Sequence, residues 1–145
     1  MNSLFNVAER IHFLPRQELF EYLVDENIAG SALTSIHNII HCVYDSRSPN
    51  ETHKYYEADL VCDGIYKMFK LFWTTHVKEI KDSASICIGR LFQNKKIDDE
   101  QMRKSIISHL KTLRNDPDEN TQITAINALN LLSKNASNNA EIQKR

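Results

Sequence analysis

Apolar residues recur every three or four positions along most of the chain, the spacing that places them on one face of an α-helix. This periodicity predicts helices over about residues 3–14, 15–26, 29–44, 55–75, 77–93, 99–114 and 118–133. The polar segment 45–54 interrupts the pattern and is expected to be a loop. The pattern therefore predicts one all-α domain over residues 1–135, with about seven helices, and a polar C-terminal tail over 136–145 that is expected to fray.

Short sequence signals refine the helix ends. Asp98 with Gln101 three residues later is typical of a capping box and is expected to begin the helix 99–114. Asn115, Asp116 and Pro117 predict a sharp corner before the next helix.

Three of the expected helices share a stripe in which an alanine is followed by aliphatic residues four and seven positions later. The alanines lie 52 and 41 positions apart; the shorter interval is in the range of helical-repeat units, and the longer one contains the polar segment 45–54. Alanine allows two helices to approach closely, while the aliphatic residues fill the space between neighbouring units. The three stripes are Ala32-Ile36-Ile39, Ala84-Ile88-Leu91 and Ala125-Leu129-Leu132.

Two segments carry a family resemblance. The sequence ISHLKTLRNDPDENTQITAINALNLLSKN (107–135) resembles a HEAT repeat, although Gln122 stands where such units often carry arginine. ALTSIHNII (32–40) resembles the third helix of an armadillo repeat and includes Asn38. The resemblance implies a right-handed α-α superhelix of about three stacked helix pairs, with residues 1–14 as a capping helix. The positions that correspond to Asn38 are Arg90 and Leu131, so at most one rung of an armadillo asparagine ladder is present.

Composition supports a helical intracellular protein. The 145 residues include only 3 Gly and 3 Pro, whereas strand-rich folds need many tight turns. Cys42, Cys62 and Cys87 form no CxxC pair, which favours reduced thiols in the cytoplasm or nucleus. Glu9 and Arg10 interrupt the first apolar stretch, so we expect no secretory signal, and no apolar run has the length of a membrane span.

The sequence offers no strong catalytic or metal-binding motif. His37 and His41 lie four residues apart, but no third ligand accompanies them. Cys87 stands between two isoleucines and is expected to be buried and inert. There is no glycine-rich phosphate loop and no nucleophile motif. We therefore expect a non-enzymatic protein without cofactor or metal.

Aromatic residues cluster in the expected helix 55–75. Phe69, Phe72 and Trp73 are expected to lie mainly in the core. One of them is a candidate exposed anchor for a partner, because tryptophan is enriched at interface hot spots.

The resemblance places a partner-binding surface on the concave face, which the second helices of the pairs line. The polar residues on the outward sides of these helices form an expected polar, mildly basic strip. We expect this strip to bind an acidic or polar segment of a partner protein, as in a scaffold or adaptor. Its residues are His37, Asn38, His41, Arg90, Gln93, Asn130 and Lys134.

Two alternative functions stay open. The segment 95–114 is basic and suggests a nucleic-acid-binding module, although the net charge of −1 and adjacent acidic residues favour a solvated helix face. The basic residues of this region are Lys95, Lys96, Arg103, Lys104, Lys111 and Arg114. A trafficking adaptor of the VHS or ENTH kind has a similar size and helix count, but its residue signatures are missing.

Overall fold

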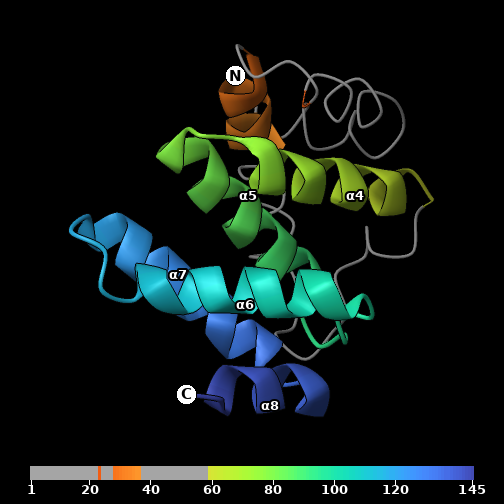
Figure 1. Cartoon of the computed structure of the whole chain (residues 1–145), viewed down its shortest axis with the longest axis vertical. Helices are drawn as coiled ribbons and strands as arrows, with labels where there is room; N and C mark the ends of the chain where they lie inside the picture. Colours follow the sequence, from red (N-terminus) through yellow and green to blue (C-terminus); the bar gives the residue numbers. More distant parts are fainter. Residues whose placement is uncertain (1–22, 24–27, 37–58) are drawn as a thin grey trace, which may run out of the picture.

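The computed structural model describes residues 23, 28–36 and 59–145 of the chain, with side chains from residue 64 onward in the last range. Helices account for nearly all of this part, and no strand occurs among the described residues. Residues 28–36 are helical, followed by α4 (Asp59–Thr74), α5 (Lys78–Leu91), α6 (Glu100–Leu113), α7 (Glu119–Leu132) and α8 (Ala136–Gln143) (Figure 1). The all-α prediction is confirmed. The expected helices 3–14 and 15–26 and the expected loop 45–54 lie outside the described residues, apart from residue 23.

Short polar side chains begin three of the helices. Asp99 accepts a hydrogen bond from the backbone N–H of Met102 at 2.9 Å, so the cap of α6 is Asp99 and the assignment to Asp98 was wrong by one residue. Asp118 caps α7 in the same way, and Asn135 caps α8. These side chains satisfy backbone donors that have no partner within their own helix. Helix α5 begins after Val77 without a side-chain cap.

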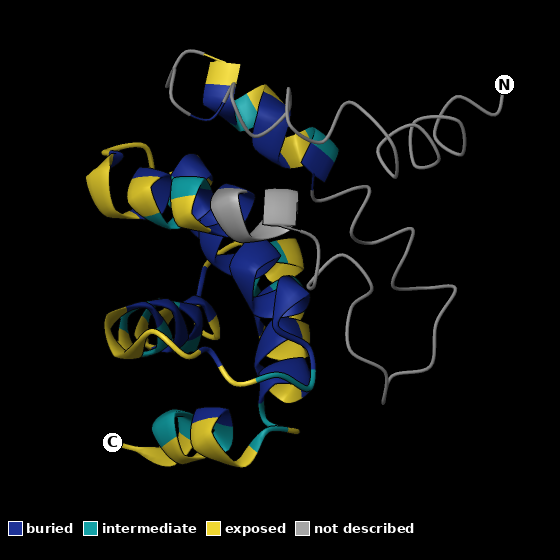
Figure 2. Ribbon diagram, turned by 90° about the vertical axis from the view of Figure 1, so that its right-hand side faces the viewer, coloured by how far each residue is buried: buried dark blue, intermediate teal, exposed yellow. Residues whose placement is uncertain are grey.

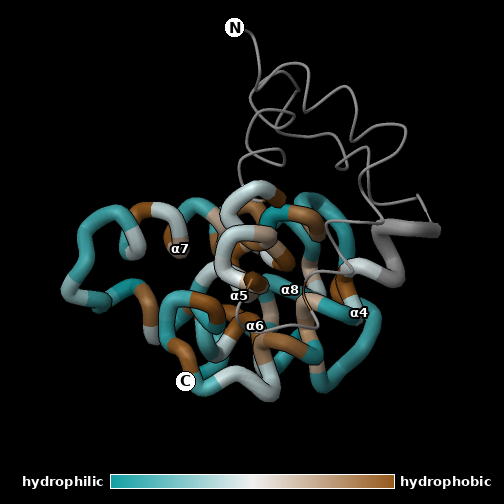
Figure 3. Tube along the Cα trace, turned by 90° about the horizontal axis from the view of Figure 1, so that it is seen from above, coloured by the Kyte–Doolittle hydropathy of each residue, from teal (hydrophilic) through white to brown (hydrophobic). Residues whose placement is uncertain are grey.

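Helix α5 lies at the centre of the described part. It packs against α4, α6 and α7, and from above it lies between α4 and α7 (Figure 3). Gly89 allows α5 to pack closely against α6 and α7. An added Cβ at this position would lie 3.2 Å from both the Cβ of Ala128 and the Cδ1 of Leu110. With neighbours on several sides, most of α5 is buried, including residues that are polar.

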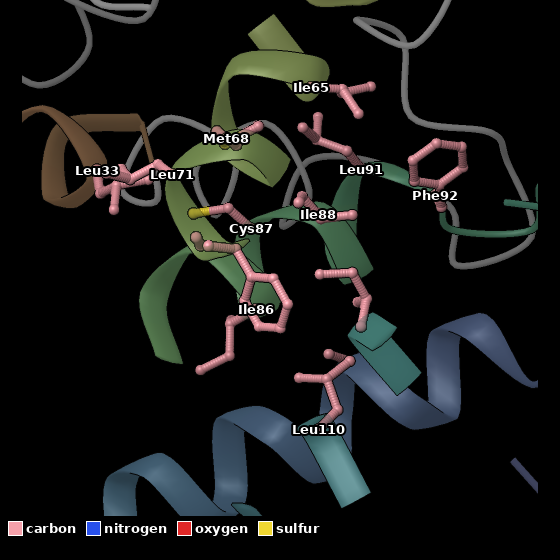
Figure 4. Close-up of a cluster of buried hydrophobic side chains, with 14 of the residues drawn as sticks. Leu33, Ile65, Met68, Leu71, Ile86, Cys87, Ile88, Leu91, Phe92 and Leu110 are labelled. Atoms are coloured by element: carbon pink, nitrogen blue, oxygen red, sulfur yellow. The ribbon is translucent and has the colours of Figure 1, made fainter. Parts of the chain in front are cut away.

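The hydrophobic core follows the alanine stripes. Ala84 and Ala125 have no exposed surface, and Ala32 is also buried. The aliphatic residues that follow Ala84 and Ala125 join the same cluster, which Figure 4 shows where α4, α5 and α6 meet. Exposed residues lie on the outer sides of the helices (Figure 2). The alanine-bearing helices α5 and α7 contact each other directly.

The polar C-terminal tail forms a helix. The expectation that residues 136–145 fray was wrong, because α8 covers Ala136–Gln143 and packs against α6 and α7. Its side chain Asn138 is fully buried. The Nδ2 of Asn138 donates to the carbonyl oxygen of Lys95 at 2.7 Å, and its Oδ1 accepts from the backbone N–H of Ile97 at 3.1 Å. These bonds attach α8 to the turn between α5 and α6.

None of the described helices combines the length and the apolar character that crossing a lipid bilayer requires.

Candidate protein-interaction surface

The expected polar strip is interrupted at its centre. Arg90 is 5% exposed and Gln93 is 2% exposed, so the placement of these two side chains on an outward face was wrong. The physical reason is that α5 has helices packed around it, which leaves its C-terminal end without a solvent-facing side. Asn130 and Lys134 are exposed as predicted. His37, Asn38 and His41 lie outside the described residues.

A different set of side chains shares an exposed face with Asn130. Ile123, Ile126, Asn127 and Asn130 are all exposed and follow the spacing of one helix face. Ile123 is 51% exposed and Ile126 is 39% exposed, while the opposite side of α7 is buried in the core. We call these four residues the α7 face. Sequence reasoning missed the two isoleucines, although their position outside the Ala125 stripe was a usable signal.

The α7 face carries no charge. Glu119, in the first turn, is the only charged residue of α7, whereas charged residues make up 26% of the whole chain. A solvent-facing helix normally carries charged residues along its outer side. Exposed isoleucines between uncharged amides match the composition of an interface core, from which charged residues are depleted. The α7 face is therefore the best candidate for a surface that a partner covers.

A shallow hollow adjoins the beginning of α7. It has a volume of about 130 Å³ and lies between α5 and α7. Ser83 and Ile86 contribute to it from α5, and Asn120, Thr121 and Thr124 contribute from α7. Its lining is uncharged, as is the α7 face. A partner segment on the α7 face would therefore find an uncharged continuation toward α5.

A charged network joins α5 to the corner before α7. The Nζ of Lys78 donates to the Oδ2 of Asp82 at 2.6 Å and to the Oδ2 of Asp116 at 2.7 Å. The Nε2 of His109 lies 2.8 Å from the Oδ1 of Asp82. The hydrogen bond from Lys78, together with one from the backbone N–H of Asp118, lowers the pKa of Asp116. The hydrogen bonds to the carboxylates of Asp116 and Asp82 raise the pKa of Lys78 above its usual range.

The cavity beside this network has a volume of about 340 Å³, which is at the lower end of the range for small-molecule pockets. Its principal charges already compensate one another, because Lys78 bridges both aspartates. A side-chain hydrogen bond also holds this corner, because the Nε2 of Gln122 donates to the carbonyl oxygen of Asp116. We interpret this network as a structural tie between α5 and the α6–α7 corner.

The basic residues of α6 contact their own chain. Lys104 forms an ion pair with Glu100 at 2.6 Å, and an Nη1 of Arg103 donates to the carbonyl oxygen of Ile97 at 2.8 Å. The Nζ of Lys111 donates to the carbonyl oxygen of Lys144. These three basic side chains of α6 therefore interact with groups of their own chain. Local contacts of this kind are typical of a solvated helix face.

The remaining chemical candidates lie in the core or outside the described residues. Cys87 is fully buried, as predicted, and burial raises the pKa of its thiol to about 12, which disfavours the reactive thiolate form. Cys42 lies outside the described residues, as does the side chain of Cys62. Among the residues that the structure describes, no His, Cys, Asp and Glu side chains are grouped to hold a metal ion. Phe72 is buried and Trp73 is 56% exposed, so one aromatic of the predicted group does face outward.

Comparison of the chain with protein-family models, with curated proteins and with solved structures finds no match.

Proposed function

We propose that this chain is a non-enzymatic protein-interaction module of the helical-repeat kind, which binds a segment of a partner protein through the α7 face. The observation that carries the proposal is the pair of exposed isoleucines, Ile123 and Ile126, on a helix face without charge. Exposure of these apolar side chains to water is unfavourable, whereas a partner that covers them removes apolar area from water and so stabilises the complex.

The packing of α5 and α7 supports a HEAT- or armadillo-like arrangement. Helix α5 follows α4 in the chain, and helix α7 follows α6, as the second helices of two consecutive pairs would. Both α5 and α7 carry an alanine stripe in the core. Direct contact between α5 and α7 is the contact expected between second helices of stacked pairs. In that arrangement the α7 face belongs to the second-helix side, where helical-repeat proteins commonly bind their partners.

The proposed partner segment presents apolar side chains flanked by uncharged polar groups. Burial of Arg90 removes one of the two lysine or arginine side chains from the strip that the sequence suggested, and the α7 face itself is uncharged, so an uncharged segment fits better than an acidic one. Asn127 and Asn130 offer amide donors and acceptors at the border of the isoleucines. Complete burial of an isoleucine contributes about 1.5–3 kcal/mol, so covering two half-exposed side chains contributes about half of that for each.

Site-specific photocrosslinking in cells tests the proposal. A photoreactive amino acid at position 126 is expected to give a discrete adduct with a partner protein. The matched control places the same amino acid at Ser108, an exposed position of α6 outside the α7 face. Introducing Ile123→Asp beside the crosslinker should remove the adduct. Identical adducts at both positions, or an adduct that survives Ile123→Asp, would contradict the proposal.

A further inference from the structure

A small cavity lies where α4 meets the turn between α5 and α6. Its volume is about 120 Å³. Small-molecule pockets are typically about 300–1,000 Å³, so this cavity has room for a single side chain only. The cavity is formed by residues far apart in sequence, from Ile65 on α4 to Met102 on α6. It shares no residue with the α7 face.

The interior of the cavity is apolar, and its rim is polar. The buried residues Ile65, Phe92, Ile97 and Met102 form the interior. Figure 4 shows Ile65 and Phe92 on neighbouring elements at this edge of the core. The ring of Tyr66, which is 60% exposed, stands at the rim together with the carboxylates of Asp98 and Asp99. An apolar interior below an acidic rim is complementary to a group that is apolar along its length and cationic at its end.

The two carboxylates are not equivalent. Asp99 is occupied as the cap of α6, where its Oδ1 accepts from the N–H of Met102. Asp98 is exposed and forms no hydrogen bond or ion pair with any other residue that the structure describes. On α6, the guanidinium of Arg103 donates to the carbonyl oxygen of Ile97 at 2.8 Å and not to Asp98. Asp98 is therefore the carboxylate at this rim that is available to an incoming cation.

We propose that this cavity binds a lysine or arginine side chain of a partner protein. The methylene groups of such a side chain lie in the apolar interior, while its charged end stays at the rim in water. There the cation meets the carboxylate of Asp98 and the face of the Tyr66 ring, which attracts cations through its quadrupole. The site is independent of the α7 face and differs from it in chemistry, because it selects a positive charge.

Small cationic probes test this site directly. Methyl NMR spectra of the full chain are recorded while n-butylammonium, n-butylguanidinium or n-butanol is added. The two cations are expected to give saturable shifts of the Met102 and Ile97 methyl signals, with an affinity at least about threefold higher than that of n-butanol, a difference of about 0.65 kcal/mol. The neutral alcohol measures the contribution of the apolar interior alone.

Substitutions show which side chains produce the preference for cations. Asp98→Asn should reduce the affinity for n-butylammonium toward that for n-butanol, and Tyr66→Leu should weaken the binding of both cations. The matched control Glu79→Gln removes one negative charge at an exposed position of α5 and should change nothing. Equal affinity for cations and alcohol, absence of a saturable shift, or full cation binding by Asp98→Asn would overturn the proposal. Ile126→Asp should leave probe binding unchanged, so the two proposals can fail separately.

Discussion

At the level of single residues, Asp116 shows how a charge fixes a corner. Its carboxylate accepts hydrogen bonds from Lys78 on α5 and from the backbone N–H of Asp118. Both bonds favour the ionised carboxylate, and they lower the pKa of Asp116 below its ordinary value of about 3.9. A group with a lowered pKa in the folded state stabilises the fold above its unfolded pKa, and this contribution is lost as the pH falls through the folded value.

Replacement of Asp116 by asparagine isolates the charge. Asparagine keeps a side-chain oxygen that can accept from Asp118, but it loses the ion pair with Lys78. We expect Asp116→Asn to lower the melting temperature at pH 7, and we expect this difference to shrink as the pH falls below about 4 and through the lowered pKa of Asp116, where the carboxylate of the folded wild type becomes protonated. Thermal unfolding of both proteins, followed by circular dichroism at pH 7 and at a pH below about 4, measures the difference in melting temperature. An equal difference at both pH values would show that the charge of Asp116 has no part in stability.

The type of residue predicted whether a side chain is buried or exposed correctly at some positions and wrongly at others. Cys87 is flanked by isoleucines, and its burial could be predicted because its neighbours on both sides are apolar. Arg90 and Gln93 are polar, and polarity alone placed them wrongly at the surface. Their burial depends on the number of helices around α5, which is a tertiary property that periodicity does not encode.

At the level of elements, Gly89 controls how closely α5 packs against α6 and α7. We expect Gly89→Ala to destabilise the fold by about 1 kcal/mol, because crowding costs of about 1–3 kcal/mol exceed the gain in helix propensity of about 1 kcal/mol. Gly30→Ala is the matched control, since an added Cβ there would meet nothing closer than the Cγ1 of Ile80 at 3.9 Å. Chemical denaturation should show lower stability for the first variant and unchanged or higher stability for the second. Equal effects would contradict the proposed crowding.

Helix α8 depends on hydrogen bonds more than on apolar burial. Only Ile142 contributes a hydrophobic contact with the core, whereas Asn138 is fully buried and bonds to Lys95 and Ile97. Asn138→Ala leaves the buried N–H of Ile97 and the part-buried carbonyl of Lys95 without this partner, at a cost of about 1–3 kcal/mol. We expect faster amide hydrogen exchange throughout α8 in this variant. Asn139→Ala, at the adjacent half-buried position, should leave exchange in α8 nearly unchanged. Equal protection of α8 in both variants would show that Asn138 does not hold it.

The predictability of each helix follows from its source of stability. Helices α4 to α7 bury an apolar side, and their predicted ends agree with the structure to within a few residues. The cap of α6 was misplaced by one residue because Asp98 and Asp99 are adjacent and both are suitable caps. Helix α8 could not be predicted from periodicity, because a single buried asparagine and a few backbone bonds replace the apolar stripe.

At the level of the whole molecule, charge is distributed unequally over the surface. Helix α6 carries charged residues along its exposed side, whereas α7 is uncharged beyond its first turn and exposes two isoleucines. The acidic rim near Asp98 belongs to a third region, at the opposite end of α6 from the corner that leads to α7. The account therefore assigns apolar binding and cation binding to separate surfaces of one helical domain.

The most direct test of the α7 face is the affinity of the purified chain for the partner identified by crosslinking. Titration calorimetry should show that Ile126→Asp weakens binding by at least about tenfold, or 1.4 kcal/mol, because a buried unpaired carboxylate replaces an apolar contact. Ser108→Asp, which adds the same charge on α6, should leave affinity unchanged, and both variants should keep the wild-type melting temperature within about 2 °C. Because the α7 face is uncharged, wild-type affinity should change little between low and high salt. Equal affinities for the two variants would contradict the assignment of partner binding to this face.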